Sequence, residues 1–358
     1  MILVTGFPGF IAERLLPRLL ELSPDPSFVC LVQEKFADLA RRRILAIEDR
    51  HRYTRGRITA VTGDITLDRL GLDATAARRL QDQLTGAWHL AAVYDLAVSP
   101  EVGQRVNVGG TRQVTEFLSG ARRLQRLDYV STAYVAGTAT GVFKESDLDV
   151  GQSFKNHYEE TKFLAERGVV ESGLPATIYR PAIVVGDSRT GETAKFDGPY
   201  FTLAAMDRMP SPGVFFRIGS GRNPANIVPL DFVVEAMARL SSLGGAPGRT
   251  YHLTDPAPLS TLEVARLFAR ALGKRFAFVP VPLSVARTLL SPGPIRRFFG
   301  MPLETLDYFD HPCAYDATQA TAALALLGVS CPRLPDYVDR LVAFYRTHRG
   351  DVRSEAMA

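Results

Sequence analysis

Two residues near the middle of the chain, Tyr158 and Lys162, have the types and the spacing that acid catalysis can use. They lie four residues apart in Tyr-Glu-Glu-Thr-Lys, and in a helix this spacing places both side chains on one face. An ammonium group beside a phenol lowers the phenol pKa from about 10 toward neutrality, which makes the tyrosine a usable proton donor. The alternative is a solvated tyrosine stacked on a lysine stem. Further features must therefore agree before the pair predicts a general acid.

A glycine turn near the N-terminus is the second feature with chemical meaning. The apolar run Ile2 to Val4 precedes the turn Thr5 to Ala12, and an amphipathic stretch from Glu13 to Leu22 follows. This pattern predicts a strand, a turn and a helix. Glycines let the backbone approach a pyrophosphate, and the first amides of the helix offer it donors, although a plain tight turn is the alternative. The residues expected to contact a dinucleotide here are Gly6, Pro8, Gly9, Phe10 and Ile11.

The elements that must position these residues alternate between apolar runs and helical patterns. The runs expected to form strands are Ile2 to Val4, Phe28 to Val32, Ile58 to Val61, Ala87 to Ala91, Leu127 to Val130 and Ala176 to Tyr179. The helical patterns are approximately Phe36 to Ile47, Ala74 to Leu84, Arg105 to Ala121 and His157 to Glu171. This alternation predicts an α/β fold with a doubly wound parallel sheet of the Rossmann type and ligands at one edge. Because Pro17 removes a backbone hydrogen bond, we expect a bend or a short first helix.

A smaller, mostly helical substrate lobe is predicted where the alternation ends. The stretch from Thr190 to Asn226 is rich in glycine, proline and phenylalanine and is too irregular for another strand and helix unit. The helix that begins at Asp231 and the strand Tyr251 to Leu253 are expected to return to the sheet. We therefore expect residues 1–190 and 226–254 to form a dinucleotide-binding domain, and residues 191–225 and 255–358 to form the substrate-binding lobe.

Composition and charge are typical of a globular protein. The 358 residues are 46% hydrophobic, and no apolar run reaches the ~18 residues of a membrane span. No positively charged leader is present, and the cysteines, Cys30, Cys313 and Cys331, lack metal-ligand spacing. These features predict a cytoplasmic location. The net charge of +4 comes mostly from arginine on a solvated surface, and no nucleic-acid motif accompanies it.

Six short motifs follow one another in a fixed order. They are Thr5-Gly6-x-x-Gly9-x-x-Ala12, His89-Leu90-Ala91-Ala92, Asn107-x-x-Gly110-Thr111, Ser131-Thr132-Ala133-Tyr134-Val135, Tyr158-x-x-x-Lys162 and Arg180-Pro181-Ala182-Ile183-Val184. In order and spacing they resemble the extended short-chain dehydrogenase/reductase family over roughly residues 1 to 255. Within that family, Val184 to Gly191 and Ile227 to Val233 are most similar to the male-sterility branch. That branch holds fatty acyl-CoA reductases and thioester reductase domains.

The resemblance implies catalytic roles for three residues. Tyr158 would donate a proton to the substrate carbonyl oxygen, and Thr132 would hydrogen-bond the same oxygen. Lys162 would lower the phenol pKa and hold the ribose hydroxyls. For Thr132, simple capping of the turn is the alternative. The pattern around Asn107 implies a structural or water-holding role, and His89 is expected to satisfy a local hydrogen bond rather than act as the acid.

The resemblance also implies a dinucleotide cofactor along the edge of the sheet. The implied contacts are Asp64 and Ile65 for the adenine, Ala91 and Ala92 for the diphosphate and ribose, and Pro181, Ala182 and Ile183 for the carboxamide. Asn107 lies in the same region. At the end of the second strand, Gln33 occupies the place where thioester reductases typically carry an arginine for the extra phosphate of NADP. NADP is the expected cofactor, with Lys35 and nearby arginines to meet that phosphate, and NAD stays open as an alternative.

For the substrate, the resemblance implies reduction of an acyl thioester to an aldehyde or alcohol. The acyl group would arrive on CoA or on an acyl carrier protein, and it would do so in trans, because these 358 residues contain no carrier domain. Two other readings stay open. One is a nucleotide-sugar epimerase or dehydratase with tightly bound NAD, which would use Thr132, Tyr158 and Lys162 in the same way. The other is a non-catalytic NAD(P)-binding sensor. The sequence predicts neither the acyl length nor the oligomeric state.

Overall fold

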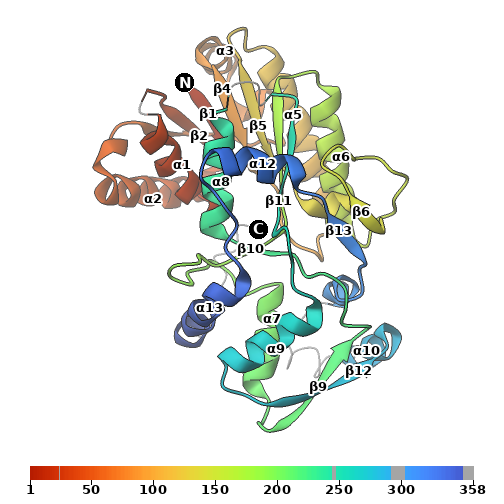
Figure 1. Ribbon diagram of the computed structural model, residues 1–358. Helices are drawn as coiled ribbons and strands as arrows, with labels where there is room; N and C mark the ends of the chain where they lie inside the picture. Colours follow the sequence, from red (N-terminus) through yellow and green to blue (C-terminus); the bar gives the residue numbers. More distant parts are fainter. Residues whose placement is uncertain (24, 244–246, 292–302, 350–358) are drawn as a thin grey trace.

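A seven-stranded parallel sheet forms the centre of the computed structural model, which describes residues 1–23, 25–243, 247–291 and 303–349 (Figure 1). The strands lie in the order β11, β7, β5, β4, β1, β2, β3, and every neighbouring pair is parallel. Their bounds are β1 Ile2–Thr5, β2 Phe28–Val32, β3 Ile58–Thr62, β4 Gly86–His89, β5 Arg126–Val130, β7 Ala176–Pro181 and β11 Thr250–Leu253. The order runs outward from β1 in both directions, which confirms the predicted doubly wound fold.

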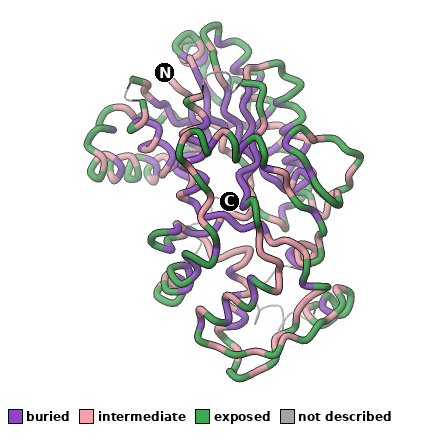
Figure 2. The backbone as a smooth tube through the Cα atoms, viewed as in Figure 1, coloured by how far each residue is buried: buried purple, intermediate pink, exposed green. Residues whose placement is uncertain are grey.

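Helices cover both faces of this sheet and bury two apolar layers. The main ones are α1 Phe10–Leu22, α2 Ala37–Arg50, α3 Ala74–Gln83, α5 Gly110–Ser119, α6 His157–Glu171, α8 Leu230–Ser241 and α12 Thr318–Leu326. One buried cluster joins the sheet to α1, α2, α8 and α12, and a second joins it to α3, α5 and α6. Figure 2 shows the buried residues concentrated along the strands and on the helix faces turned toward them. These layers fix the strand ends, from which the candidate site is built.

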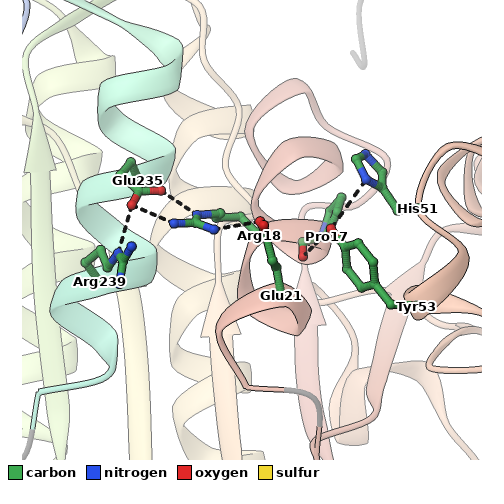
Figure 3. Close-up of polar contacts among 7 residues, drawn as sticks. All are labelled: Pro17, Arg18, Glu21, His51, Tyr53, Glu235 and Arg239. Carbon is green, nitrogen blue, oxygen red and sulfur yellow. Dashed lines mark hydrogen bonds and ion pairs between the residues drawn. The ribbon is translucent and has the colours of Figure 1, made fainter. Parts of the chain in front are cut away.

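Two helical segments differ from the expectation. Helix α1 continues through Pro17 to its end, so a short first helix is the wrong prediction. The missing backbone bond is tolerated because this face of α1 is packed into the core. The Pro17 carbonyl also accepts a hydrogen bond from the Tyr53 hydroxyl at 3.3 Å (Figure 3). The helix expected over residues 105–121 begins earlier, at Pro100, and consists of α4 Pro100–Gly103, a π-helical turn η4 Gln104–Gly109, and α5.

The second lobe lies below the sheet in Figure 1 and contains more regular structure than expected. Its elements include β8 Ile183–Val185, α7 Pro199–Arg208, β9 Gly213–Ile218, β10 Ile227–Pro229, α9 Thr261–Ala271, β12 Phe276–Val281, α10 Leu283–Leu290 and α13 Leu334–His348. Strand β9 pairs in parallel with β12, and β8 pairs with β10. Helix α7 and strand β9 lie within residues 190–226, but β9 pairs with β12, so this stretch adds no further strand and helix unit to the central sheet, as predicted. Helices α7, α9 and α13 share their own buried cluster.

Shorter elements complete the described part of the chain. They are η1 Glu34–Phe36, η2 Arg52–Thr54, η3 Asp68–Gly71, η5 Ala133–Ala136, η6 Leu303–Tyr308, and the parallel pair β6 Gly141–Phe143 and β13 Cys313–Tyr315. Late in the chain, α12 packs on α8 and β11 of the sheet. The predicted division at residues 190, 226 and 254 stays a prediction, and residues 292–302 and 350–358 of the predicted lobe lie outside the described part. Within the described part, none of the helices has the length and apolar character needed to span a membrane.

Candidate active site

The glycine turn after β1 is held against the end of β4. Gly6 has a φ of +88°, and a Cβ at this position would lie 2.7 Å from the backbone nitrogen of Ala91. Only glycine fits such a close approach in this conformation. Gly9 caps α1 without a side-chain acceptor, which leaves the first amides of the helix able to bind an anion. This cradle suits a diphosphate, and the predicted contacts within it are Gly6, Pro8, Gly9, Phe10 and Ile11.

Three further predicted contacts meet at the ends of β2 and β3. The Gln33 side-chain amide donates a hydrogen bond to Asp64 Oδ2 at 2.8 Å. The other carboxylate oxygen of Asp64 accepts from the backbone amide of Thr66 at 2.8 Å. Ile65 is buried beside them. The structure therefore places Gln33, Asp64 and Ile65 together, where the adenosine of a dinucleotide lies in a fold of this kind.

The remaining predicted cofactor contacts lie at the ends of β4 and β7, the strands on either side of β5. Ala91 and Ala92 follow β4, and both are partly exposed. Pro181 closes β7, and Ala182 and Ile183 continue from it into β8. The side chains of Ala182 and Ile183 line a cavity that extends into the second lobe. Together with the glycine cradle, these positions outline one continuous carboxyl edge of the sheet.

Thr132 and Tyr158 lie together between β5 and α6. Thr132 begins η5, where its hydroxyl caps the turn by accepting from the Tyr134 amide at 3.2 Å. Burial raises the pKa of Tyr158 well above its ordinary value, and the hydrogen bond from Thr132 opposes that shift. Thr132 thus both caps the η5 turn and contacts the Tyr158 phenol.

Lys162 lies on the same helix as Tyr158, but its ammonium group is directed to β5. Its Nζ donates to the Tyr129 hydroxyl at 3.0 Å and to the Val130 carbonyl at 2.9 Å. Burial lowers the pKa of Lys162 to about 8, and the Glu166 carboxylate opposes this shift. The sequence predicts a lowered pKa for Tyr158, but the structure gives a raised one. The reason is that burial of the phenol raises its pKa more than neighbouring groups lower it. The Lys162 side chain extends to β5 because oxygen atoms there accept hydrogen bonds from its ammonium group.

Asn107 connects the loop after β4 to the helix that carries the tyrosine and lysine. Its side-chain oxygen accepts from the Val93 amide at 2.9 Å, and its side-chain nitrogen donates to the Thr161 hydroxyl at 3.1 Å. The π-helical turn η4 carries Asn107, and such turns are frequent at functional sites. These contacts fit the structural role expected for Asn107, and its assignment as a cofactor contact stays a prediction.

His89 ends β4 and is fully enclosed. Its ring nitrogens contact the hydroxyls of Thr5 at 2.6 Å and Thr111 at 3.0 Å. Burial lowers the pKa of His89 to about 3, with the Lys162 charge as a second cause. The ring is neutral and locally hydrogen-bonded, as expected from the sequence.

An apolar cavity of about 400 Å³ lies between the sheet edge and the second lobe, with Tyr94 and Tyr134 in its wall. The Tyr94 ring lies edge-on to the Tyr158 ring, with 5.3 Å between the centroids, and Tyr94 also lines the cavity. Tyr94 and Tyr129 were missed from the sequence, because neither stands in a spacing that marks it. The deeper wall is formed by side chains of α7, β9, α9, β12 and α10, among them Phe201, Phe215, Phe268, Phe278 and Leu290.

Comparison with known proteins agrees with this geometry. A family model described as "Male sterility protein" matches residues 4–237. The nonribosomal peptide synthetase asaC of Aspergillus flavus is 27% identical over 279 residues, which cover 74% of this chain and 27% of that protein. Fatty acyl-CoA reductase wat of Drosophila melanogaster is 26% identical over 275 residues, which cover 66% of this chain and 53% of that protein. The chain spans about a quarter of the length of the first synthetases that it matches.

Solved structures give the same picture at the level of the fold. The terminal R domain from the myxalamid PKS-NRPS biosynthetic pathway has a TM-score of 0.81 and 28% identity, with 98% of this chain and 91% of that chain covered. UDP-glucuronic acid 4-epimerase from Bacillus cereus has a TM-score of 0.66 and 18% identity, with 98% of both chains covered. The epimerase shares the fold alone.

Proposed function

This chain belongs to the male-sterility protein family of NAD(P)-dependent oxidoreductases of the extended short-chain type, and we propose that it reduces an acyl thioester. The observation that carries the proposal is the apolar cavity of about 400 Å³ whose wall includes Tyr94, the residue in ring contact with Tyr158. A cavity of this size and lining suits an acyl chain. The thioester carbonyl would then lie next to Tyr158 and Thr132, which adjoin Tyr94 and Tyr134 of the cavity wall.

In this proposal the acid is Tyr158. The substrate carbonyl oxygen gains a proton from the phenol and accepts a second hydrogen bond from Thr132, so that charge on the oxygen is stabilised as it develops. A raised phenol pKa keeps Tyr158 protonated until the oxygen becomes basic. Lys162, already cationic and buried, is assigned to the ribose hydroxyls. When bound, the nicotinamide supplies the hydride.

We assign NADP as the preferred cofactor. The cradle of Gly6 and Gly9 fits the diphosphate of either dinucleotide, because a Cβ at Gly6 would collide with the backbone at Ala91. Lys35 lies on η1, which Gln33 caps, and in this proposal its ammonium meets an extra phosphate on the adenosine ribose. Direct comparison of the two coenzymes tests the assignment.

The carrier of the acyl group is CoA or an acyl carrier protein. The resemblance in length and fold to the myxalamid R domain supports a carrier protein, and the resemblance to a fatty acyl-CoA reductase supports CoA. A cytoplasmic location stays a prediction. The epimerase reading is less well supported, because the cavity lining is largely apolar whereas a nucleotide sugar requires many polar partners. The sensor reading would need damaged acid residues, and Thr132 and Tyr158 are both present.

The test is oxidation of NADPH, and in parallel NADH, with acyl-CoA thioesters and with acyl thioesters of N-acetylcysteamine. Tyr158→Phe should lower kcat by about 10²- to 10⁴-fold, because the proton donor is lost, while the dissociation constant for NADPH changes little. Tyr53→Phe, the same chemical change on the remote η2, is the matched control and should retain full activity. Near-normal turnover by Tyr158→Phe would refute the mechanism. Failure to reduce any thioester would refute the proposed reaction.

A further inference from the structure

Three polar atoms in the wall of the apolar cavity have no hydrogen-bond partner among the described residues. They are the hydroxyl oxygens of Thr261 and Thr305 and the Nε2 atom of His311. All three atoms are buried, and the Thr305 side chain belongs to a residue that is 6% exposed. Asn226 also lines the cavity, but its amide is satisfied on both sides by the Asp255 backbone, at 2.8 and 3.0 Å. Unlike the Asn226 amide, these three buried atoms have no hydrogen-bond partner among the described residues.

Thr305 lies on a segment that is tied to the catalytic helix. Tyr308 is three residues further along η6, and residues with this spacing lie one 3₁₀ turn apart, about 6 Å. The Tyr308 hydroxyl accepts a hydrogen bond at 2.8 Å from Asn156, the residue that caps α6. Its ring lies 4.6 Å from the ring of Tyr134, beside the proposed acid. Thr305 therefore belongs to the same side of the cavity as Tyr308, whose ring contacts Tyr134.

Thr261 and His311 belong to two walls that a short chain of hydrogen bonds connects. The Thr261 backbone amide donates to the Asn223 carbonyl at 3.0 Å. The Asn223 side chain in turn donates to Asp310 at 3.0 Å, one residue before His311. The polar groups are thus held on connected elements on different sides of the same cavity.

The three groups favour an uncharged partner. Burial and, as a second cause, the nearby Lys155 charge lower the pKa of His311 to about 4, so the imidazole is neutral at physiological pH. A neutral imidazole and two hydroxyls can each donate or accept a hydrogen bond. A group left unpaired in such a place costs free energy that a matching ligand would recover. Saturated hydrocarbon offers no such match.

We propose that Thr261, Thr305 and His311 form a subsite for an uncharged hydrogen-bonding group, a hydroxyl or an amide, carried on the acyl chain of the substrate. The preferred substrate is then a hydroxylated or amide-bearing acyl thioester rather than a plain saturated one. This inference rests on the proposed thioester reduction and specifies its substrate class.

The test compares kcat/KM for thioesters of one chain length. The panel contains octanoyl-N-acetylcysteamine, its analogues with a hydroxyl at C3, C5 or C7, an analogue with an amide in the chain, and one with a terminal carboxylate. At least one hydroxyl or amide analogue should exceed the octanoyl thioester by about tenfold, because a site that hydrogen-bonds its substrate discriminates against analogues lacking that group. Preference for the carboxylate would instead point to Arg217, which also lines the cavity, and would overturn the proposal.

Variants locate the effect. Thr305→Val and Thr261→Val retain the side-chain shape, remove the hydroxyl, and should each reduce the ratio of kcat/KM for the polar analogue to kcat/KM for the octanoyl thioester severalfold. Thr347→Val on the exposed face of α13 is the matched control and should leave the preference unchanged. An unaltered preference in both cavity variants, or a wild-type preference for the octanoyl thioester, overturns the subsite.

Binding separates failure of the subsite from failure of the proposed reaction. Octanamide and its best hydroxylated analogue are titrated calorimetrically into the wild-type protein and into Thr305→Val. If no thioester is reduced but the hydroxylated amide still binds about tenfold more tightly, and Thr305→Val removes the difference, the subsite stands and the reaction is wrong. If thioesters are reduced and both amides bind equally, the subsite is wrong and the reaction stands.

Discussion

The charge on Lys162 is the most sensitive residue-scale feature of the site. Its ammonium is enclosed between α6 and β5, where Tyr129 and Val130 each supply one oxygen acceptor. Desolvation disfavours the cation and lowers the pKa of Lys162 to about 8. A group that must stay cationic to hold ribose hydroxyls is therefore close to its titration point in the cofactor-free protein.

The affinity for NADPH should consequently depend on pH. Lysine is cationic below its pKa, so the charge is present at pH 7 and is lost as the pH rises through about 8. Fluorescence titration should show a dissociation constant about tenfold larger at one unit above that pKa than well below it. Lys162→Arg stays cationic throughout and should bind with a flat profile over the same range. A flat profile in the wild-type protein would contradict the assigned role of Lys162.

Residue identity was easier to predict than residue partners. The spacing of Tyr158 and Lys162 placed both on one helix face, because helical geometry alone decides it. The hydroxyl of Tyr129 as the lysine partner could not be predicted, since it depends on how α6 packs on β5. The unfavourable phenol environment escaped prediction for the same reason, because burial is a property of the folded chain.

At the scale of elements, the turn between β1 and α1 depends on one glycine. Gly6→Ala would place a Cβ 2.7 Å from the Ala91 backbone at a φ of +88°. We expect a loss of at least about 2 kcal/mol in the free energy of unfolding and loss of NADPH binding. Gly56→Ala is the matched control, because φ is +68° there and a Cβ would meet nothing within 4 Å. It should cost about 1 kcal/mol by strain alone and bind NADPH normally. Urea unfolding measures the stability of the two variants, and NADPH titration measures their cofactor affinity. Equal stability and equal affinity of the two variants would contradict the role assigned to Gly6.

The contact between α1 and α8 should make stability depend on pH. Arg18 contacts both carboxylate oxygens of Glu235, at 2.5 and 2.8 Å, and Arg239 contacts the same group at 2.8 Å (Figure 3). The hydrogen bond from Arg18 lowers the pKa of Glu235. A lowered carboxyl pKa stabilises the fold above the ordinary value of 4.5, and the contribution is lost as the pH falls through the lower folded-state value.

Replacement of this carboxylate provides the test. Glu235→Gln should lower the free energy of unfolding by about 1 kcal/mol at pH 7, and the difference from wild type should shrink in acid. Glu116→Gln, in the exposed pair with Arg112 at 3.7 Å, is the control and should change stability little. A difference that is the same in acid and at pH 7 would show that the ion pair is not its cause. Denaturant unfolding of each variant at pH 7 and at acidic pH measures the difference in the free energy of unfolding.

Elements defined by local signals were predicted best. The bounds expected for α6 match those observed, because Asn156 caps the helix and its apolar spacing is regular. Strand β9 was missed, since it exists through parallel pairing with β12, more than fifty residues later. Local patterns carry no information about such distant pairing.

At the scale of the whole molecule, function arises where the sheet edge meets the second lobe. Alternation of strands and helices predicted the cofactor edge, because parallel strands end on one side. The cavity could not be predicted in the same way. Its lining joins Tyr94 from the loop after β4, Phe268 from α9 and Tyr308 from η6, which only tertiary packing brings together. The lobe therefore determines the substrate while the sheet determines the chemistry.

The volume of this cavity should set the acyl length that the protein accepts. Each methylene transferred from water into the cavity contributes about 0.8 kcal/mol, so kcat/KM should rise about fourfold per carbon along a series of unbranched acyl thioesters. The rise should stop when the cavity of about 400 Å³ is full. Ala265→Leu adds bulk to the wall from α9 and should move that plateau to a shorter chain, because less volume remains. Ala325→Leu, on the exposed face of α12, makes the same change away from the cavity and should leave the plateau unmoved. A rate independent of acyl length, or an identical plateau in both variants, would show that the acyl chain lies elsewhere.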